Sequence, residues 1–403
     1  MLHQASGSPK RVVSRRKFLH RLGWTACGAS ALTLGRPGVA GEPSPAAGSS
    51  RREPVPLIHQ TDLFRPHCDP DDHFDLACAY ALAARGDVNL LGILADFPPP
   101  GYKGDPDVAG VAMLNRLTGL AAPLVVGTSL RPHSPHDTLP SAPPEELAGV
   151  RWLLRTLRQS PTPAAISIVG SCRDVAVALR REPATFARKC RGIYLNAGTG
   201  EPRPSPDAQL EYNVALDPFS YATIFAAPCP VYWLPCFEHL DPGRLPPGPQ
   251  RHGTFYQFRM GEVFSQLAPS MQQFFLSMLE QAPAADWLKS LRHPVDAAKL
   301  AHWSGQIRSM WSTSALLQIG GLTVAGDGAV VPLAGGRDAV YRFAPVQVKC
   351  DAAGRTRWQY GAAEPPRWKF ELTDVGRYPA AMTRALAALL RPLGRAASPA
   401  RRP

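Results

Sequence analysis

The sequence predicts an α/β fold, with an open, mainly parallel sheet and helices on both of its faces. Two observations predict it. Apolar runs of strand length alternate with segments of helical periodicity along most of the chain, which is typical of parallel strands joined by helical crossovers. In addition, a group of aspartates lies where the first apolar run gives way to a helix, and open α/β sheets bind ligands at such junctions.

The elements follow from these patterns in order. Strands are predicted at residues 56–60, 88–94, 123–127, 165–170, 192–196 and 230–235. Helices are predicted at residues 74–82, 108–118, 145–158 and 172–181. Residues 244–301 look helical and predict a cap over the sheet edge, residues 344–358 a small β-hairpin, and residues 378–393 a final helix. No shift in composition marks a second domain, so residues 55–395 are expected to form one.

The first forty residues predict an export signal that does not belong to the fold. Residues 14–19 read S-R-R-K-F-L, which matches the twin-arginine pattern, and a modest apolar stretch with a small-x-small cleavage site follows. The alternative is a membrane anchor, but this stretch is too short for a stable membrane span. We expect a signal peptide at 1–40, a linker at 41–54 and a disordered tail at 396–403, with the mature protein periplasmic or extracellular.

The charge pattern argues against nucleic-acid binding. The chain carries a formal net charge of +12. Seven of its basic residues and no acidic ones lie before residue 41, so about +5 remains after the predicted signal. The rest contains no basic helix and no stripe of Lys or Arg with interleaved aromatic residues. A small-molecule ligand is therefore expected instead of a nucleic acid.

The most informative segment is residues 61–75, which reads T-D-L-F-R-P-H-C-D-P-D-D-H-F-D. It holds five aspartates: Asp62, Asp69, Asp71, Asp72 and Asp75. Carboxylates packed this tightly repel one another unless a cation or solvent screens them, and they are ligands that Ca²⁺ and Mg²⁺ prefer. The alternative is a set of solvated acidic residues that cap the helix. His67 and His73 could bring a transition metal, although we favour exposed loop positions for both.

Several motifs stand in a set order along the chain: Q-T-D (60–62) with D-P-D-D (69–72), P-L-V-V-G (123–127), V-G-S-C-R-D-V-A (169–176), L-N-A-G (195–198), L-E-Y-N-V-A-L-D-P-F (210–219) and the hairpin at 346–358. Together they resemble the inosine-uridine-preferring nucleoside hydrolases, and the resemblance runs from about residue 56 to 393. It implies a nucleoside-hydrolase-like (Rossmann-like) fold, and the chain resembles a divergent, twin-arginine-exported member of that family.

The resemblance implies Ca²⁺-assisted hydrolysis of the N-glycosidic bond of a nucleoside or another ribosyl compound, with another divalent metal as an alternative. Carried over by motif, Asp62, Asp71 and Asp72 would bind the metal, with Asp62 as the general base. Asp69 competes for either role because the loop is longer than the family's. The backbone carbonyl of Arg173 would complete the metal ligands. Many family members are dimers or tetramers, so a homo-oligomer is possible.

Two residues of the L-E-Y-N motif would bind the sugar. The resemblance assigns hydrogen bonds to the ribose to Glu211 and Asn213. Asn213 could instead be a turn residue. For the nearby Asp217, followed by Pro218, we favour a helix N-cap.

The chain departs from the family pattern at the presumed site. Trp311 and Ser312 stand where the family has a histidine and its last metal-binding aspartate, and a proline run follows Asp96 in place of an expected asparagine. Trp311 could stack on a base or sugar, or belong to the core. We therefore keep two functions open, an exported hydrolase and a sugar-binding or nucleoside-binding protein that has lost efficient catalysis. Phosphoester hydrolysis is a third, for which no phosphate-binding loop is seen.

Overall fold

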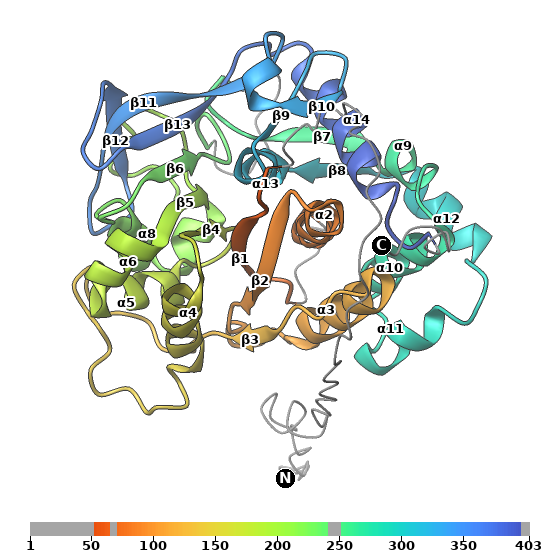
Figure 1. Ribbon diagram of the computed structural model, residues 1–403, viewed down its shortest axis with the longest axis horizontal. Coiled ribbons are helices and arrows are strands. Elements are labelled where there is room, and N and C mark those ends of the chain that lie inside the picture. The colour runs from red at the N-terminus through yellow and green to blue at the C-terminus, as the bar shows by residue number, and fades with distance from the viewer. Residues whose placement is uncertain (1–51, 65–70, 241–250, 396–403) are drawn as a thin grey trace, which may run out of the picture. The chain divides into compact units, whose positions relative to one another are not determined.

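A nine-stranded sheet forms the centre of the molecule, in the order β12-β11-β13-β6-β5-β4-β1-β2-β3 (Figure 1). The strands are β1 (Val55–Thr61), β2 (Val88–Ala95), β3 (Leu124–Val126), β4 (Ala164–Ile168), β5 (Cys190–Asn196), β6 (Val231–Leu234), β11 (Tyr341–Cys350), β12 (Thr356–Tyr360) and β13 (Arg367–Leu372). All neighbours from β13 to β3 pair in parallel, whereas β11 is antiparallel to both β12 and β13. The predicted α/β fold with a mainly parallel sheet is confirmed.

This computed structural model describes residues 52–64, 71–240 and 251–395. The chain divides into two units, residues 1–52 and 53–403, and only the second is described below. The predicted signal peptide, most of the predicted linker, the tail after residue 395, and the site candidates Asp69 and His67 lie outside the described residues.

Helices cover both faces of the sheet. On one side lie α4 (Ala148–Gln159), α5 (Arg173–Arg181), α6 (Pro183–Lys189) and α8 (Pro218–Ile224). On the other lie α2 (Asp71–Arg85), α3 (Asp105–Thr118), α13 (Thr313–Ile319) and α14 (Tyr378–Leu390). Because successive side chains of a strand point to opposite faces, Leu57 and Ile58 of β1 belong to the two different hydrophobic clusters.

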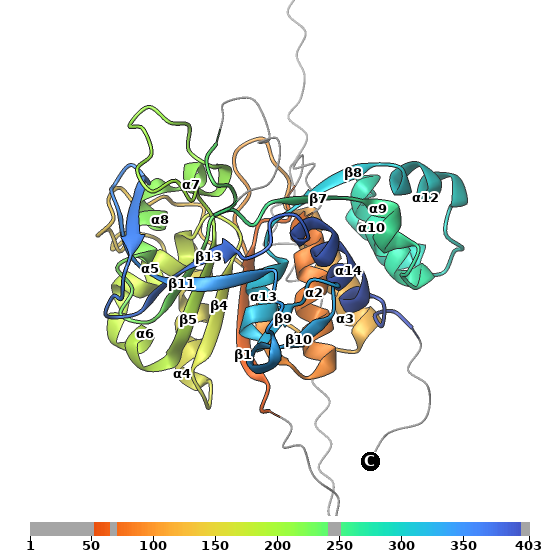
Figure 2. The ribbon, with the colours of Figure 1, turned by 90° about the horizontal axis from the view of Figure 1, so that it is seen from above.

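The cap region differs in part from the prediction. Residues 251–259 are not helical, and β7 (Tyr256–Arg259) pairs with β8 (Ile307–Met310) in a separate antiparallel ribbon. Between them lie α9 (Met260–Phe264), α10 (Pro269–Leu279), α11 (Ala284–Ser290) and α12 (Ala297–Ser304), which Figure 2 shows gathered beside α3 and α14. A second ribbon pairs β9 (Leu322–Val324) with β10 (Val330–Pro332).

The predicted C-terminal hairpin is present as β11 and β12, but the sequence patterns did not predict β13. Its charged residues Arg367, Lys369 and Glu371 alternate along the strand, as in a solvent-facing strand, yet all three are buried. Arg367 donates to backbone carbonyl oxygens, and Lys369 pairs with Glu371. Charged residues are usually exposed, but here these internal partners allow them to be buried.

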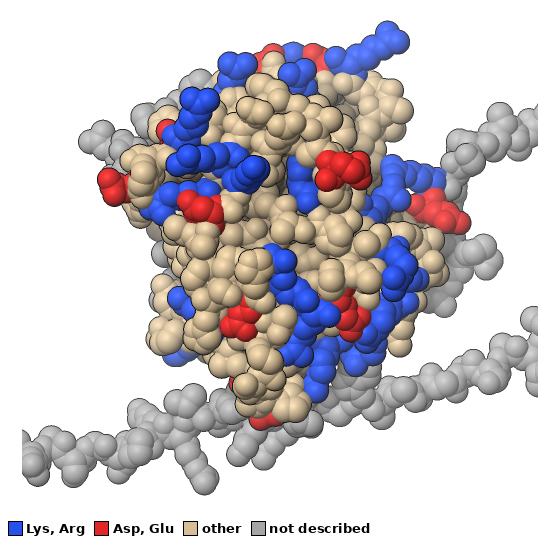
Figure 3. All heavy atoms as spheres, turned by 90° about the vertical axis from the view of Figure 1, so that its left-hand side faces the viewer, with Lys and Arg blue, Asp and Glu red and all other residues tan. Residues whose placement is uncertain are grey.

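The outer surface carries charged side chains of both signs (Figure 3). Figure 3 shows one face, where Lys and Arg side chains predominate and acidic side chains lie among them. One surface ion pair joins Arg158 of α4 to Glu182 at 2.6 Å. Among the described residues, the search for a helix long and apolar enough to cross a bilayer found none.

Candidate active site

The site is built where parallel strands end. Asp62 directly follows β1, Asp96 follows β2, and Asn196 is the last residue of β5. Carboxyl ends of parallel strands share one edge of the sheet, so residues far apart in sequence meet there. Asp62, Asp96 and Asn196 are each at least 97 % buried.

Asp62 is buried without the donors that usually accompany a buried carboxylate. Among the described residues, no N–H or hydroxyl group donates to either of its oxygens, although only 1 % of the residue is exposed. Burial, followed by the nearby Asp96 carboxyl, raises the pKa of Asp62 well above its usual value, and Asp71 and Glu211 act in the same direction. A hydrogen bond with the Asp72 carboxyl, which requires a shared proton, opposes this shift.

Helix α2 brings three further carboxylates to the same place. Asp71, Asp72 and Asp75 are buried in its first turns, and one oxygen of each lies within 4.8 Å of the others. Residues three and four apart share one helix face, which explains why Asp75 joins the first two. Burial raises the pKa of Asp75 to about 8, although the hydroxyl groups of Ser312 and Thr313 lower it. The acidic first turn also favours the helix dipole.

A cavity of about 560 Å³ opens beside these carboxylates. It is lined by Asp71, Asp72, Tyr102, Val169, Asn196, Gln209, Leu210, Glu211, Tyr212, Asn213, Ala215, Cys236, Phe237, Leu240, Trp311 and Ser312. Pockets of this size, with a few convergent polar groups on an apolar wall, suit small ligands. Of the predicted site residues, Asp71, Asp72, Glu211, Asn213, Trp311 and Ser312 are brought together here.

The two predicted sugar-binding residues are held in place by the backbone. Glu211 accepts hydrogen bonds from the N–H groups of Gly198 (2.8 Å) and Asn213 (3.0 Å), and it caps α7 (Tyr212–Leu216). Burial raises the pKa of Glu211, which these N–H groups oppose. The Asn213 amide donates to the carbonyl oxygens of Val169 (3.1 Å) and Asn196 (3.4 Å). Its amide oxygen is left available for a ligand in the cavity.

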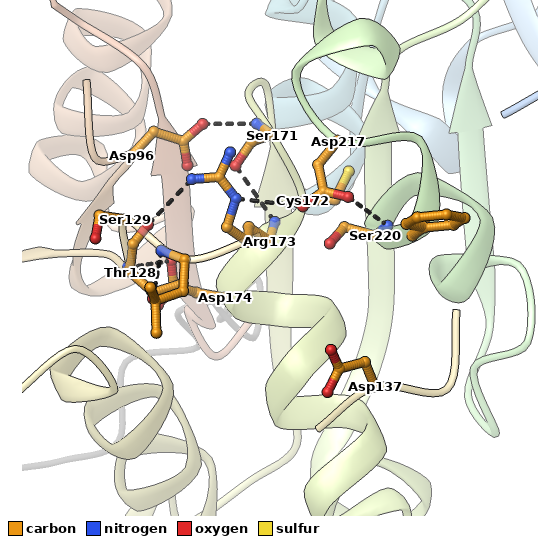
Figure 4. Close-up of polar contacts among 12 residues, drawn as sticks. Asp96, Thr128, Ser129, Asp137, Ser171, Cys172, Arg173, Asp174, Asp217 and Ser220 are labelled. Carbon is orange, nitrogen blue, oxygen red and sulfur yellow. Dashed lines mark hydrogen bonds and ion pairs between the residues drawn. The ribbon is translucent and has the colours of Figure 1, made fainter. Parts of the chain in front are cut away.

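Arg173 and Asp96 both line a second, smaller cavity of about 310 Å³. Figure 4 shows the guanidinium group of the arginine between Asp96, Thr128 and Asp217. It donates to the Thr128 carbonyl oxygen (3.1 Å) and pairs with Asp217 (3.3 Å). Asp217 also accepts from the N–H of Ser220 (3.1 Å), which confirms it as the N-cap of α8. The metal-binding role of the Arg173 carbonyl stays a prediction.

Trp311 packs among aromatic residues and also lines the cavity, while stacking on a ligand stays a prediction. Its ring packs against Phe237 and Phe255, with ring centroids 5.8 Å and 5.4 Å away, and it also lines the cavity. Its indole N–H has no partner among the described residues. Trp311 is therefore a wall residue whose indole N–H is buried. Ser312, directly before α13, is buried in the same wall.

One prediction was wrong, and some residues were missed. His73 is not an exposed loop residue, because it lies buried in α2 with its ring 6.1 Å from Phe274 and 6.0 Å from Trp287. Asn196, whose amide oxygen is buried without a partner, was seen only as the end of a strand. Asp96 was seen only as the start of a proline run; its carboxylate accepts from Gln60 and from the N–H of Ser171 (2.6 Å).

These residues fit a divalent cation. Oxygen ligands carrying several negative charges are what Ca²⁺ and Mg²⁺ require, and Asp62 contributes two buried oxygens without donors. Burying a carboxylate without a compensating partner is costly. A cation bound beside Asp62 would remove that cost, and the carboxylates of Asp71 and Asp72 would add further negative charge to the site.

Comparisons with known proteins agree with the resemblance seen in the motifs. No protein-family model matches the chain. A segment of 92 residues is 29 % identical to the pyrimidine-specific ribonucleoside hydrolase RihA of Salmonella arizonae; it covers 23 % of this chain and 29 % of that protein. The chain is thus similar to a nucleoside hydrolase in sequence, over less than a third of the relative's length.

Solved structures extend the similarity to most of the chain. The effector protein XOO4466 matches with a TM-score of 0.50 and 14 % identity, covering 85 % of this chain and 94 % of that one. The inosine-uridine preferring nucleoside hydrolase of Bacillus anthracis gives a TM-score of 0.45 and 13 % identity, covering 84 % and 99 %. At such identities a structural likeness concerns the fold alone.

Proposed function

We propose that the chain is an exported hydrolase that cleaves the N-glycosidic bond of a nucleoside or related ribosyl compound, with a carboxylate-bound divalent metal, Ca²⁺ in the first instance. The single observation that carries this proposal is the pair of carboxylates Asp71 and Asp72 on the wall of the 560 Å³ cavity, with the buried Asp62 carboxyl in contact with Asp72. Similarity to a ribonucleoside hydrolase over part of the chain supports the same reaction.

Asp62, Asp71 and Asp72 would hold the metal. When bound, the cation would supply positive charge to the sugar hydroxyls and to a water molecule. Cleavage passes through an oxocarbenium-like transition state. The water oxygen forms a bond to the anomeric carbon, the bond to the base nitrogen breaks, and its electron pair leaves with the base. Asp62 accepts the proton of the water, as a general base does.

The remaining polar groups of the cavity would orient the sugar. Glu211, Asn213 and Asn196 present oxygen atoms from backbone-anchored positions, so little side-chain entropy is lost when a hydroxyl group binds. Trp311 and Phe237 form an apolar wall on the same cavity, which suits a base or the apolar face of a sugar.

A binding protein with weak or no catalysis is the second candidate. One observation favours it. Trp311 and Ser312 line the cavity where the family pattern has a histidine and an aspartate, and a serine hydroxyl is a poorer ligand for Ca²⁺ than a carboxylate. The leaving base would then lack a histidine to protonate it.

The proposal is tested by calorimetric titration with Ca²⁺ of two metal-stripped proteins, the wild type and the Asp71→Ala variant. We expect binding by the wild type and its loss in the variant. A nucleoside is then added to the metal-loaded chain, and release of the free base is followed by absorbance. Metal-dependent release supports the hydrolase, metal-dependent binding without release supports the second candidate, and a wild type that binds no Ca²⁺ contradicts the metal-assisted mechanism.

Export by the twin-arginine route is part of the proposal and rests on residues 14–19. It places the activity in the periplasm or outside the cell. Expression with Arg15 and Arg16 both changed to Lys should leave the protein in the cytoplasmic fraction. Export that persists in this variant would contradict the route.

A further inference from the structure

The structure contains one carboxylate that the family pattern does not use. Asp75 lies in α2 one helical turn after Asp71 and Asp72, and none of its surface is exposed. In a helix, residues at positions i, i+3 and i+4 share a face. This explains how one oxygen from each of the three carboxylates comes within 4.8 Å of the others.

Asp75 also lies against the position where a carboxylate is missing. Its Oδ1 is 3.5 Å from the Thr313 hydroxyl, and the Ser312 hydroxyl contacts the same carboxyl group. Ser312 stands where the family pattern has its last metal-binding aspartate. The carboxyl group of Asp75 thus lies beside the side chain that replaces that aspartate.

Two sets of oxygens in this region have no donor. Among the described residues, no N–H or hydroxyl group donates to Asp75 Oδ2 or to either oxygen of Asp62, and all three atoms are buried. A neutral, purely structural carboxyl group would be expected to use its buried oxygens in hydrogen bonds. Oxygens that have no donor and lie in an acidic cluster are suited to a cation instead.

We propose that Asp75 supplies the carboxylate that the family pattern places at Ser312, so that the divalent cation is held by α2 and the end of β1, with Ser312 orienting Asp75 through its hydroxyl group. This inference rests on the proposed metal-assisted function. The metal-binding carboxylate would then come from α2 instead of the start of α13, and its negative charge would lie in nearly the same place as in the family pattern.

The proposed role of Asp75 is tested by titrating the metal-stripped full chain with Ca²⁺ and measuring the heat of binding by calorimetry. Asp75→Asn keeps the shape of the side chain and removes its charge. We expect the dissociation constant for Ca²⁺ to rise about tenfold or more, since affinity at such sites follows the number of charged ligands. Adding Ser312→Asp to this variant should restore most of the affinity. The matched control is Asp207→Asn, because Asp207 is exposed.

The outcomes separate this inference from the proposed function. If Asp71→Ala abolishes Ca²⁺ binding but Asp75→Asn binds as the wild type does, the metal site stands and the role of Asp75 is wrong. If the wild type binds no Ca²⁺, both fail. An Asp75→Asn chain that loses affinity without regaining it from Ser312→Asp would contradict the relocation.

A second variant covers the case in which Asp75→Asn does not fold. Ser312→Asp alone adds a carboxylate to the wild type. If Asp75 already fills the position, we expect the affinity for Ca²⁺ to change by less than about threefold. A gain of about tenfold or more would mean that the cation lacked a carboxylate ligand there, and would overturn the inference.

Discussion

The molecule contains two buried groups of charged residues, and they balance their charges in opposite ways. Beside the main cavity, Asp62, Asp71, Asp72 and Asp75 lie together at the ends of β1 and the start of α2. On β13, four strands away from β1 in the sheet, Lys369 is buried with partners of its own. The first group is short of positive charge, whereas the second supplies its own counter-charge.

The surroundings of Lys369 show a buried charge that has several partners within the protein. Its ammonium group lies 3.0 Å from His252 Nδ1, 3.7 Å from Glu371 and 4.2 Å from the centre of the Trp358 ring. Glu371 is further held by Arg342 and Tyr360. Asp62 has no comparable donors. Since a buried charge without a partner is costly, the contrast supports the proposal that a cation binds beside Asp62.

The largest effect is expected from Asp62→Asn. Removing the general base should lower kcat for base release by about 10²- to 10⁴-fold, the usual contribution of such a group. The same change removes a carboxyl group whose pKa burial and Asp96 raise. The metal-free variant should therefore unfold at a higher temperature than the metal-free wild type, because one buried negative charge is gone.

Both measurements use the exposed Asp207→Asn as the control. Activity is compared at saturating Ca²⁺, so that weaker metal binding does not imitate the loss of a base. A metal-free Asp62→Asn chain that melts below the wild type would show that Asp62 is already satisfied, and the contrast between the two groups would disappear.

These two groups also show what the sequence can and cannot predict. The alternation of apolar runs and helical segments predicted the parallel sheet, because apolar residues make up most of each central strand. β13 was missed because Arg367, Lys369 and Glu371 pair inside the protein. Asp62, Asp71 and Asp72 were found from local spacing. The contact of Asp75 with Thr313, 238 residues later, depends on how α2 packs against α13, which no local pattern contains.

A smaller effect is expected from Lys369→Met, and it depends on pH. Burial lowers the pKa of Lys369 to about 8, from a usual value near 10.4. Between these values the unfolded chain binds more protons at this group, so its contribution to stability increases as pH rises from about 8 to about 10.4. Below pH 8 the cost of the buried charge is fully present. The variant lacks this contribution.

Urea denaturation at pH 7.5 and pH 10.5 measures the difference. Between pH 7.5 and pH 10.5, the free energy of unfolding of the wild type should increase relative to that of the variant. The expected increase is on the order of 1 kcal/mol per unit of pKa shift. Lys349→Met, at an exposed position of β11, is the control and should follow the wild type. Parallel pH curves for wild type and Lys369→Met would mean that Lys369 titrates as an exposed lysine does.

The smallest effect is expected from Arg342→Gln, at the exposed edge of the same group. Arg342 donates two hydrogen bonds to Glu371, at 3.1 Å and 3.2 Å, but 67 % of its side chain is exposed. Water and salt screen such a pair, so its loss should cost less than about 1 kcal/mol of unfolding free energy, and less at high salt. Urea denaturation at low and high salt measures this. If the loss of unfolding free energy equals that of Lys369→Met at pH 7.5, the exposed Arg342 neutralises Glu371 as much as the buried Lys369 does. Lys369 and Glu371 would then not form a buried group that balances its own charge.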